Sequence, residues 1–374
     1  MSDVPHLRFP EFSGEWEKKR FKDVCNITTG NKNTQDKSDD GIYPFYVRSQ
    51  NVERINSWTF DGEAILTAGD GVGVGKVFHY STGKIGVHQR VYILSDFKCD
   101  GKYLYSYFAG NFYNRVKRMS AKNSVDSVRM EMIADMPISL PSTMEQKKIG
   151  HLLALLDERI ATQNKIIEKL ETLIKGFVDS IFTANKFPKV PFKEIYVRAG
   201  EGGTPATSNP EYYDNGTIPF IKIDDLQNKY IKTNKDCITE LGLQKSSAWI
   251  VPANSIIYSN GATIGAISIN LFPVCTKQGI LGVVPKADIN VEFLYYFMTS
   301  TAFTKAVERI VTEGTMRTAY LKDINHIPCP VPYPVKQDEI AKMLSTLSEK
   351  LENEVIFQMK LQKQKEFLLS QMFI

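Results

Sequence analysis

The sequence predicts a mixed α/β (α+β) protein made of two copies of one unit, in which a globular domain is followed by a long helix. Three features of the 374 residues support this prediction. A series of short motifs occurs twice in the same order, the first part of each copy contains short strand-like runs, and the second part carries apolar residues at helical spacing. We expect globular domains at 1–144 and 186–335, and long helices at 145–185 and 336–374.

The internal repeat is the strongest of these features. Phe21-Lys22-Asp23-Val24 recurs as Phe192-Lys193-Glu194-Ile195 with a spacing of 171 residues, and Gln146 recurs as Gln337 with a spacing of 191. The spacing grows stepwise between these pairs, as expected when surface loops lengthen in one copy of a duplicated unit. The intervening matches are Gly41–Phe45 with Gly216–Phe220, Gly71 and Gly75 with Gly261 and Gly265, Leu104 with Leu294, and Pro137 and Pro141 with Pro328 and Pro332.

The first part of each copy is expected to combine short strands with one helical stretch. β-Branched or aromatic runs that are bounded by Gly, Asn and Pro are typical of strands. The expected strands are Ala64–Thr67, Lys84–Leu94, Ser255–Ser259 and Gly279–Val284, and the expected helices are Gly101–Met119 and Val291–Ile310.

The second part of each copy follows a proline-rich segment and carries apolar residues in steps of three and four, which is the pattern of a coiled-coil seam. The first run extends from about Glu145 to Thr183 without proline, and the second begins near Lys336. The seam of the first helix comprises Ile149, Leu152, Leu156, Ile160, Ile167, Leu170, Ile174 and Phe177, with Gln163 in one position. The seam of the second comprises Ile340, Met343, Leu347, Leu351, Leu361 and Leu368, and Glu354, Gln358 and Lys365 interrupt it.

A helix of about 39 residues is roughly 58 Å long. Because such a helix would expose its apolar stripe if it stood alone, we expect the two helices to bury their stripes against each other. The alternative is that each helix packs on its own globular domain, but the helix would extend well beyond a domain ~25 Å wide.

The composition is that of a soluble globular protein, with 43% hydrophobic and 24% charged residues. It contains no apolar run long enough to span a bilayer, and its polar N-terminus lacks a signal peptide, so we expect a cytoplasmic location. Five scattered cysteines and five histidines show no metal-ligand spacing, which argues against a disulfide framework and a structural metal. The net charge of +4 comes from 1–144 and 186–335, because both long helices carry equal numbers of acids and bases.

Several segments occur in a specific order along the chain. They are Leu7–Phe12 followed by Trp16-Glu17, Gly203-Thr204-Pro205 with Asn209–Tyr213, Ile218–Lys222, Asn260–Gly265, Gln278–Ile280, Gly314–Arg317, and the proline-rich leads Pro141–Ile149 and Pro332–Ile340. Together they resemble the specificity (S) subunits of type I restriction–modification systems, and the resemblance covers nearly the whole chain.

In that family each globular unit is a target-recognition domain that reads one half of a bipartite DNA sequence. The two long helices pair antiparallel, which relates the domains by an approximate two-fold axis, and they dock two methyltransferase subunits. The resemblance therefore implies a non-catalytic subunit that binds double-stranded DNA, two methyltransferase (M) subunits and, where present, restriction (R) motor subunits. It implies no cofactor on this chain, with S-adenosylmethionine, and ATP with Mg²⁺, on the partner subunits.

The first domain departs from the family pattern. It has Thr29-Gly30-Asn31-Lys32 where the second domain has Gly203-Thr204-Pro205. We interpret this departure as a different base preference, so the two half-sites are expected to differ.

Other motifs support alternative functions less well. Gly69–Lys76 resembles a phosphate loop, but a Walker A motif needs Gly at 70 and Ser or Thr at 77, where the chain has Asp70 and Val77. Asn209–Tyr212 resembles the motif of adenine methyltransferases, although Glu211 departs from it; a methyltransferase in its own right would bind S-adenosylmethionine. A coiled-coil adaptor that binds only proteins is the other alternative. Asp224-Asp225 is interpreted as a turn cap in preference to a metal site.

Base reading requires Arg, Lys, Gln or Asn side chains on loops, while further Lys and Arg hold phosphates. The candidates in the first domain are Lys32, Arg48, Gln50, Asn51, Gln89, Arg90, Lys122 and Arg129. Those in the second domain are Lys222, Asn260, Lys277, Gln278, Arg317 and Tyr320.

Overall fold

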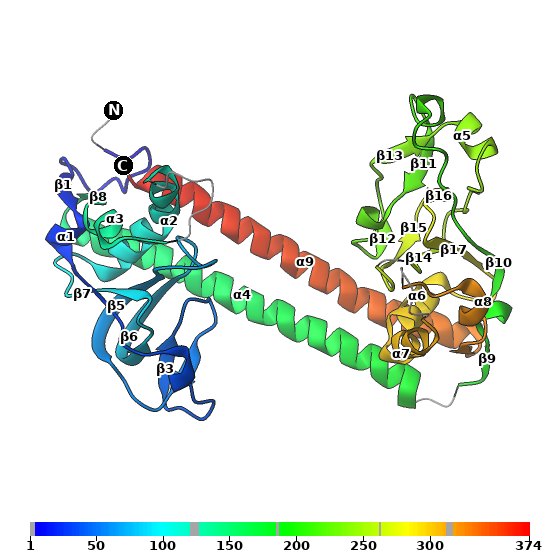
Figure 1. The fold of residues 1–374 in the computed structure, drawn as a ribbon, viewed down its shortest axis with the longest axis horizontal. Helices are drawn as coiled ribbons and strands as arrows, with labels where there is room; N and C mark the ends of the chain where they lie inside the picture. Colours follow the sequence, from blue (N-terminus) through cyan, green and yellow to red (C-terminus); the bar gives the residue numbers. More distant parts are fainter. Residues whose placement is uncertain (1–3, 120–126, 185–186, 262, 312–316) are drawn as a thin grey trace. The chain divides into compact units, whose positions relative to one another are not determined.

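The computed structural model describes residues 4–119, 127–184, 187–261, 263–311 and 317–374 (Figure 1). The chain forms two compact units: unit 1 comprises Met1–Lys165 with Ile356–Ile374, and unit 2 comprises Ile166–Val355. Each unit therefore contains one globular domain and a part of each long helix. Among the described residues, none of the helices has the length and apolar character needed to cross a membrane.

The body of unit 1 is a six-stranded sheet in the order β2-β7-β5-β6-β3-β4. Its neighbouring strands are antiparallel except for the parallel pair β3 and β6. A separate two-stranded sheet joins β1 to β8. The strands are β1 (Glu17–Arg20), β2 (Asn26–Thr29), β3 (Tyr43–Tyr46), β4 (Glu53–Ile55), β5 (Phe60–Ala68), β6 (Phe78–Val87), β7 (Val91–Ser95) and β8 (Pro137–Leu140). The shorter helices are α1 (Phe21–Val24), η1 (Thr34–Asp36), α2 (Gly101–Met119) and α3 (Met130–Ala134).

Helix α2 covers one face of this sheet. Ile65 of β5 packs in the same core as Phe108 and Phe112 of α2, whereas its neighbour Leu66 belongs to a core on the other face, as the alternation of side chains along a strand requires. The Phe108 and Phe112 rings stack with centroids 4.5 Å apart. Both faces of β5 are therefore buried, which explains its continuous apolar run.

Unit 2 is built around a five-stranded sheet in the order β10-β17-β14-β15-β12, with a three-stranded sheet β13-β11-β16 and a two-stranded sheet β18-β9. Its strands are β9 (Lys189–Pro191), β10 (Tyr196–Glu201), β11 (Ile218–Ile221), β12 (Tyr230–Ile231), β13 (Asp236–Ile238), β14 (Ile256–Ser259), β15 (Ile267–Asn270), β16 (Cys275–Thr276), β17 (Ile280–Pro285) and β18 (Pro328–Pro330). Its shorter helices are η2 (Phe192–Glu194), η3 (Pro210–Tyr212), η4 (Ile223–Asp225), α5 (Glu240–Gln244), α6 (Val291–Thr299), α7 (Thr301–Ile310) and α8 (Leu321–Ile324).

Two expected elements are each divided in the structure. The expected strand Lys84–Leu94 is two strands, because a turn at His88-Gln89-Arg90 separates β6 from β7 and the Val91 amide donates to the His88 carbonyl at 2.9 Å. The expected helix Val291–Ile310 is interrupted at Ser300, whose hydroxyl accepts from the Phe303 amide at 3.3 Å and so caps α7. Neither break contains Gly or Pro, the residues that most strongly indicate the end of a strand or helix, so neither was predicted.

The long helices are α4 (Thr143–Ala184) and α9 (Pro334–Met372). In unit 1, Asp157 of α4 pairs with Lys365 of α9, and Ile149 shares a core with Met372. In unit 2, Phe182 of α4 shares a core with Ile340 of α9. The two helices therefore run antiparallel within each unit.

Each globular domain packs on both long helices. In unit 2, the Asp179 carboxylate of α4 accepts from the amide and the hydroxyl of Thr301 at 2.7 Å each. In unit 1, Leu369 of α9 lies against Gly110 of α2, the residue 191 positions before Thr301. The helices are thus held by the domain cores as well as by each other, so the two packing schemes weighed from the sequence occur together.

This packing shifts the buried stripe near the helix ends. Phe177 and Met343 were expected on the seam, but their side chains are 45% and 44% exposed. Val178 and Leu344, one residue further along, are buried instead. Val178 and Leu344 both belong to the core of unit 2, so near these helix ends the domain core determines which face is buried. Of the other expected seam residues, Ile149, Ile340 and Leu361 are buried and Leu152, Leu156, Ile160, Ile167, Leu170, Ile174, Leu347, Leu351 and Leu368 are half-buried.

A buried glutamine fastens the start of each long helix to its domain. Gln146 accepts from the Asp100 amide at 3.0 Å and donates to the Pro141 carbonyl at 2.7 Å. Gln337 repeats both bonds, accepting from the Asn290 amide at 2.9 Å and donating to the Pro332 carbonyl at 2.8 Å. The glutamine that recurs in the sequence therefore has the same structural role in both units.

Candidate nucleic-acid interface

Half of the candidate residues of the first domain lie on loops that meet at one edge of the six-stranded sheet. The Gln89 amide donates to the Lys32 carbonyl at 2.8 Å, and the Gln89 side chain donates to Asn33 Oδ1 at 2.6 Å. The His88 amide donates to the Tyr46 carbonyl at 3.0 Å, which places the 88–90 turn beside the end of β3. This set of loops is called the first loop edge below.

Arg48 and Arg90 share one carboxylate at the first loop edge. Arg48 Nη1 lies 2.7 Å from Asp70 Oδ1, and Arg90 Nε lies 3.7 Å from Asp70 Oδ2. Both guanidinium groups remain exposed. Two cations are therefore held by one anion, which leaves a net positive charge and several N–H donors facing solvent.

His88 lies buried behind these arginines. Burial, and then the nearby Arg48 guanidinium, lower the pKa of His88. Its Nδ1 accepts from the Arg90 amide at 3.0 Å, which requires the neutral ring with its proton on Nε2. A neutral His88 therefore supports the turn and does not add charge to the edge.

The glycine-rich segment Gly69–Gly75 forms a turn at the same edge. The Gly69 amide donates to the Arg90 carbonyl at 2.8 Å, and the Val128 amide donates to the Gly69 carbonyl at 2.7 Å. A phosphate loop opens a helix, whereas this segment leads into strand β6. The segment is therefore a tight turn, as the sequence interpretation favoured.

The remaining candidates of the first domain are more dispersed. Arg129 follows Val128 and lies exposed beside the glycine-rich turn. Gln50 and Asn51 are exposed on the loop after Arg48. Lys122 lies outside the described residues.

The second domain has an equivalent edge, called the second loop edge. The Lys277 amide donates to the Ile221 carbonyl at 3.0 Å, and the Gln278 amide donates to Thr204 Oγ1 at 3.2 Å. The side chains of Lys277 and Gln278 are exposed. Lys222, at the end of β11, forms an ion pair of 3.0 Å with Asp236.

Asn260 has a different place from the one expected. Its side chain is buried, and its Nδ2 donates to the Ala319 carbonyl at 3.2 Å while the Ala319 amide donates back to the Asn260 carbonyl at 2.9 Å. A buried side chain cannot reach a base edge, so Asn260 is not carried forward as a base contact. Its bonds fix the segment that leads to Arg317 and Tyr320, both of which are exposed.

The two edges are built by matching backbone bonds. The bond from Val128 to Gly69 corresponds to the bond from Ala319 to Asn260, since both partners are shifted by 191 residues. The Gly30 amide likewise donates to the Val91 carbonyl at 3.1 Å, as the Gly202 amide does to the Ile280 carbonyl at 3.0 Å. The duplicated sequence therefore encodes the same loop arrangement twice.

Gly30 and Gly202 were missed as an equivalent pair. A Cβ atom at either position would collide with backbone, with the Val87 carbonyl in the first domain and the Thr276 carbonyl in the second. Only glycine allows this close approach. The signal was present in the sequence, because their spacing of 172 follows the spacing of 171 seen for Phe21 and Phe192.

Two other motifs have structural roles. Asn209 Oδ1 accepts from the Glu211 amide at 3.1 Å and caps η3. Asp225 Oδ2 accepts from the Lys222 amide at 2.9 Å, so the Asp224-Asp225 pair provides the cap that the sequence interpretation favoured. Among the described residues, no cluster of His, Cys, Asp or Glu has the arrangement of a metal site.

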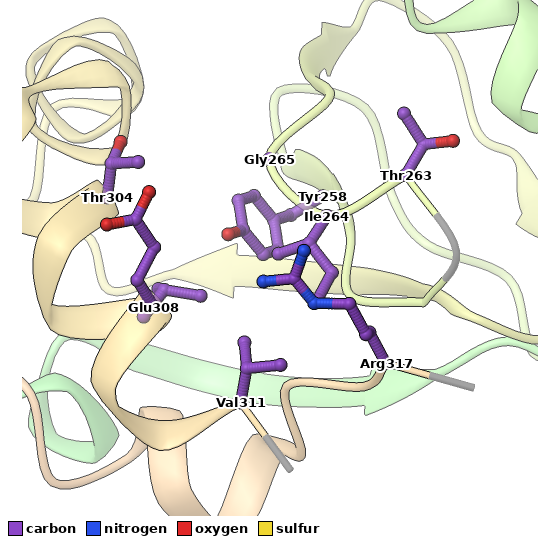
Figure 2. Close-up of a pocket in the computed structure, with 9 residues that line it drawn as sticks. Tyr258, Thr263, Ile264, Gly265, Thr304, Glu308, Val311 and Arg317 are labelled. Atoms are coloured by element: carbon purple, nitrogen blue, oxygen red, sulfur yellow. The ribbon is translucent and has the colours of Figure 1, made fainter. Parts of the chain in front are cut away.

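A cavity of about 290 Å³ adjoins the second loop edge. It lies between helix α7 and the Thr263–Gly265 turn, and Figure 2 shows Thr304 and Glu308 of the helix on one side and Tyr258 and Arg317 on the other. The walls are completed by Ile264, Thr304, Val307 and Val311.

Comparison with known proteins supports the duplication. A family model described as the type I restriction modification DNA specificity domain matches residues 13–172 and 189–360. The chain is 23% identical to the type I restriction enzyme EcoDI specificity subunit of Escherichia coli, over 89% of this chain and 81% of that protein. It is 25% identical to the MjaVIII specificity subunit of Methanocaldococcus jannaschii, over 92% of this chain and 88% of that protein.

A solved structure shares the fold. The crystal structure of a type I restriction–modification S subunit from M. genitalium superposes with a TM-score of 0.67 and 16% identity, covering 99% of each chain. The two globular domains and the two long helices are therefore an architecture that this chain has in common with that protein.

Proposed function

The chain belongs to the type I restriction–modification DNA specificity family, and we propose that it reads a two-part, asymmetric DNA target and directs methyltransferase subunits to that target. The observation that supports this function best is the loop edge that occurs twice. Each edge presents exposed basic and amide side chains on loops fixed by backbone bonds, such as Arg48 and Gln89 in the first and Lys277 and Gln278 in the second. Amide and guanidinium groups are the side chains that read base edges.

The candidate contacts divide into two classes. The exposed residues Arg48, Gln89, Arg90, Gln278 and Arg317 can make paired hydrogen bonds to a base, whereas the lysine ammonium groups of Lys32, Lys222 and Lys277 suit phosphates. Gln50, Asn51, Arg129 and Tyr320 lie on neighbouring exposed loops and remain candidates. Because the two edges carry different side chains, the two halves of the target should differ.

The long helices supply the surface for the partners. Leu173 and Phe177 of α4, and Met343 and Phe367 of α9, are large apolar side chains that remain exposed. Such surface favours protein partners. We assign it to two methyltransferase subunits, which would bind S-adenosylmethionine, and to restriction subunits where these are present. The chain itself is then a non-catalytic subunit, and we place it in the cytoplasm because its proposed substrate is cellular DNA.

The test is to express the chain together with its methyltransferase subunit and to map methylated adenines in the DNA of the host. The expected pattern is two short specific blocks around an unread spacer, seen only when this chain is present. Exchange of residues 1–144 for another recognition domain should change one block, and exchange of residues 186–335 should change the other. Methylation that does not depend on this chain would contradict the proposal, and methylation by the chain alone would identify a methyltransferase.

A further inference from the structure

At the cavity beside the second loop edge, one position of helix α7 carries a smaller side chain than its counterpart in the first copy. Phe112 and Val116 of α2 are buried, and so are Phe303 and Val307 of α7, at a spacing of 191. By the same spacing, Thr304 corresponds to Tyr113. A tyrosine in the first domain is therefore replaced by the much smaller threonine in the second.

The ring of Tyr113 fills the corresponding place in the first domain. It lies 3.0 Å from the position that a Cβ on Gly75 would take, and the Lys76 ammonium lies 5.5 Å from its centroid. Gly265 is the counterpart of Gly75, and no described residue lies within 4 Å of a Cβ built there. The first domain thus fills this space with the Tyr113 ring, whereas no described residue of the second domain approaches Gly265 in the same way.

The open space suits a small polar ring. One water needs about 10–15 Å³ of accessible volume, so about 290 Å³ admits a much larger group. Ile264, Val307 and Val311 provide apolar wall, while Tyr258, Glu308 and Arg317 provide hydrogen-bonding groups (Figure 2). Apolar wall together with a few polar groups is the usual lining of a small-molecule site, and a planar heterocycle matches that chemistry.

Tyr258 gives a second reason to expect a ligand. Its side chain is only 2% exposed, yet its hydroxyl faces the cavity and has no hydrogen-bond partner among the described residues. Burial raises the pKa of Tyr258, so the hydroxyl remains a donor at neutral pH. An acceptor that enters the cavity can receive a hydrogen bond from this hydroxyl.

We propose that this Thr304 cavity binds one nucleobase that carries an exocyclic amino group, such as adenine or cytosine. The amino group would donate to the Glu308 carboxylate, the acceptor chemistry used to read cytosine N4. Tyr258 and Arg317 would donate to a ring nitrogen or carbonyl, and the aliphatic wall would cover the ring face. The base can come from bound DNA, by leaving the stack as in base-flipping proteins, or from a free nucleoside. The DNA source rests on the proposed function, and the nucleoside source does not.

The test compares Thr304→Tyr with Tyr113→Thr in the full chain assembled with its methyltransferase subunits. Thr304→Tyr fills the cavity with the side chain that the first copy carries at this position, so the fold should be kept, and thermal unfolding would verify that. 2-Aminopurine placed beside each position of the second block reports by fluorescence when the neighbouring base leaves the stack. A signal present with the unmodified complex, lost in Thr304→Tyr and kept in Tyr113→Thr is expected. Target adenines of methyltransferases also leave the stack, so only signals lost in Thr304→Tyr count.

Two further measurements complete the test. Glu308→Gln should lower the rate of methylation at the second block roughly ten-fold, within the range of discrimination of one good base contact.

Calorimetry of the chain without DNA, titrated with adenosine and with cytidine, tests whether the base is a free nucleoside. Binding that Thr304→Tyr abolishes would support a nucleobase taken from solution. If Thr304→Tyr leaves both the fluorescence and the methylation rate unchanged, and no nucleoside binds, the cavity proposal is overturned. If the unmodified chain directs no methylation, the proposed function fails and the calorimetry alone decides on the cavity.

Discussion

Asp70 is the residue on which the arrangement of the first loop edge depends. Its carboxylate is the shared partner of Arg48 and Arg90, two of the residues proposed to reach DNA. An acid at a DNA-binding edge repels phosphates, so it weakens binding to any duplex. The same carboxylate can improve discrimination between DNA sequences if it holds the guanidinium groups in the orientation that a base requires. The two effects have opposite signs, and one substitution separates them.

Asp70→Asn should increase affinity for non-specific duplex by a few-fold and decrease the preference for the first block by about 1–3 kcal/mol, because the charge is removed and the arginines lose their anchor. Fluorescence anisotropy with specific and non-specific duplexes at one salt concentration measures both. Asp61→Asn, which removes an exposed charge from β5 of the same domain, is the matched control. Equal effects of the two variants would show that Asp70 contributes charge alone.

The N-terminal segment shows how a motif can be recognisable in sequence while its physical role is hidden. Leu7–Phe12 contributed to the family resemblance, but nothing in its pattern indicated a partner. In the structure Arg8 donates from Nε and Nη2 to the two carboxylate oxygens of Glu145, at 2.8 Å each. The Glu145 side chain is 1% exposed, and the Lys148 ammonium lies 4.4 Å from the Phe9 ring centroid. The segment therefore clamps the start of α4.

Arg8→Ala should destabilise unit 1 by about 3 kcal/mol, because it leaves the Glu145 charge buried and unpaired. We expect a loss at the lower end of what breaking a buried ion pair costs, because Arg8 is itself partly exposed. Urea unfolding would measure the change. The double variant Arg8→Ala with Glu145→Leu removes the orphaned charge and should recover part of the loss. A double variant less stable than Arg8→Ala would argue against this explanation.

At the scale of the long helices, the sequence predicted the elements well and their buried faces less well. Both long helices were expected, and the structure contains them as α4 and α9. The predicted seam was wrong at Phe177 and Met343, which are exposed, because a heptad pattern assumes that one partner helix covers the apolar stripe. Near the ends of these helices the domain cores cover it instead, and no local pattern contains that information.

Leu344→Ala should therefore cost about 2–5 kcal/mol of unfolding free energy, the usual range for a buried leucine. Its neighbour Met343, which the sequence placed on the seam, should change stability by about 0.5 kcal/mol or less when truncated to alanine. Chemical denaturation of both variants makes this comparison within one helical turn. If truncation of Met343 destabilised the protein more than Leu344→Ala does, the seam predicted from the sequence would be correct.

At the scale of the whole molecule, the repeat explains why so much could be predicted. Matching residues at spacings of 171 to 191 identified two equivalent domains, and the structure builds both with the same hydrogen bonds, such as those from the side chains of Gln146 and Gln337 to the backbone. The site could be predicted only as a set of exposed side-chain types. Burial of Asn260, the anchoring of two arginines by Asp70 and the Thr304 cavity depend on contacts between segments far apart in the chain, which residue types do not reveal.

Because the domains are duplicated, we expect their contributions to the free energy of DNA binding to be independent of each other. Arg48 and Lys277 belong to different units and share no hydrogen-bond or ion-pair partner in the structure described. Effects of such separate sites add to within about 0.3–0.5 kcal/mol. Arg48→Ala should therefore relax the first block, Lys277→Ala should weaken binding at the second, and the double variant should lose the sum of the two binding free energies. Anisotropy titrations of the assembled complex would give the three values. A double variant that loses much less than the sum would mean that the two domains engage DNA only together, so that losing one contact already releases the other.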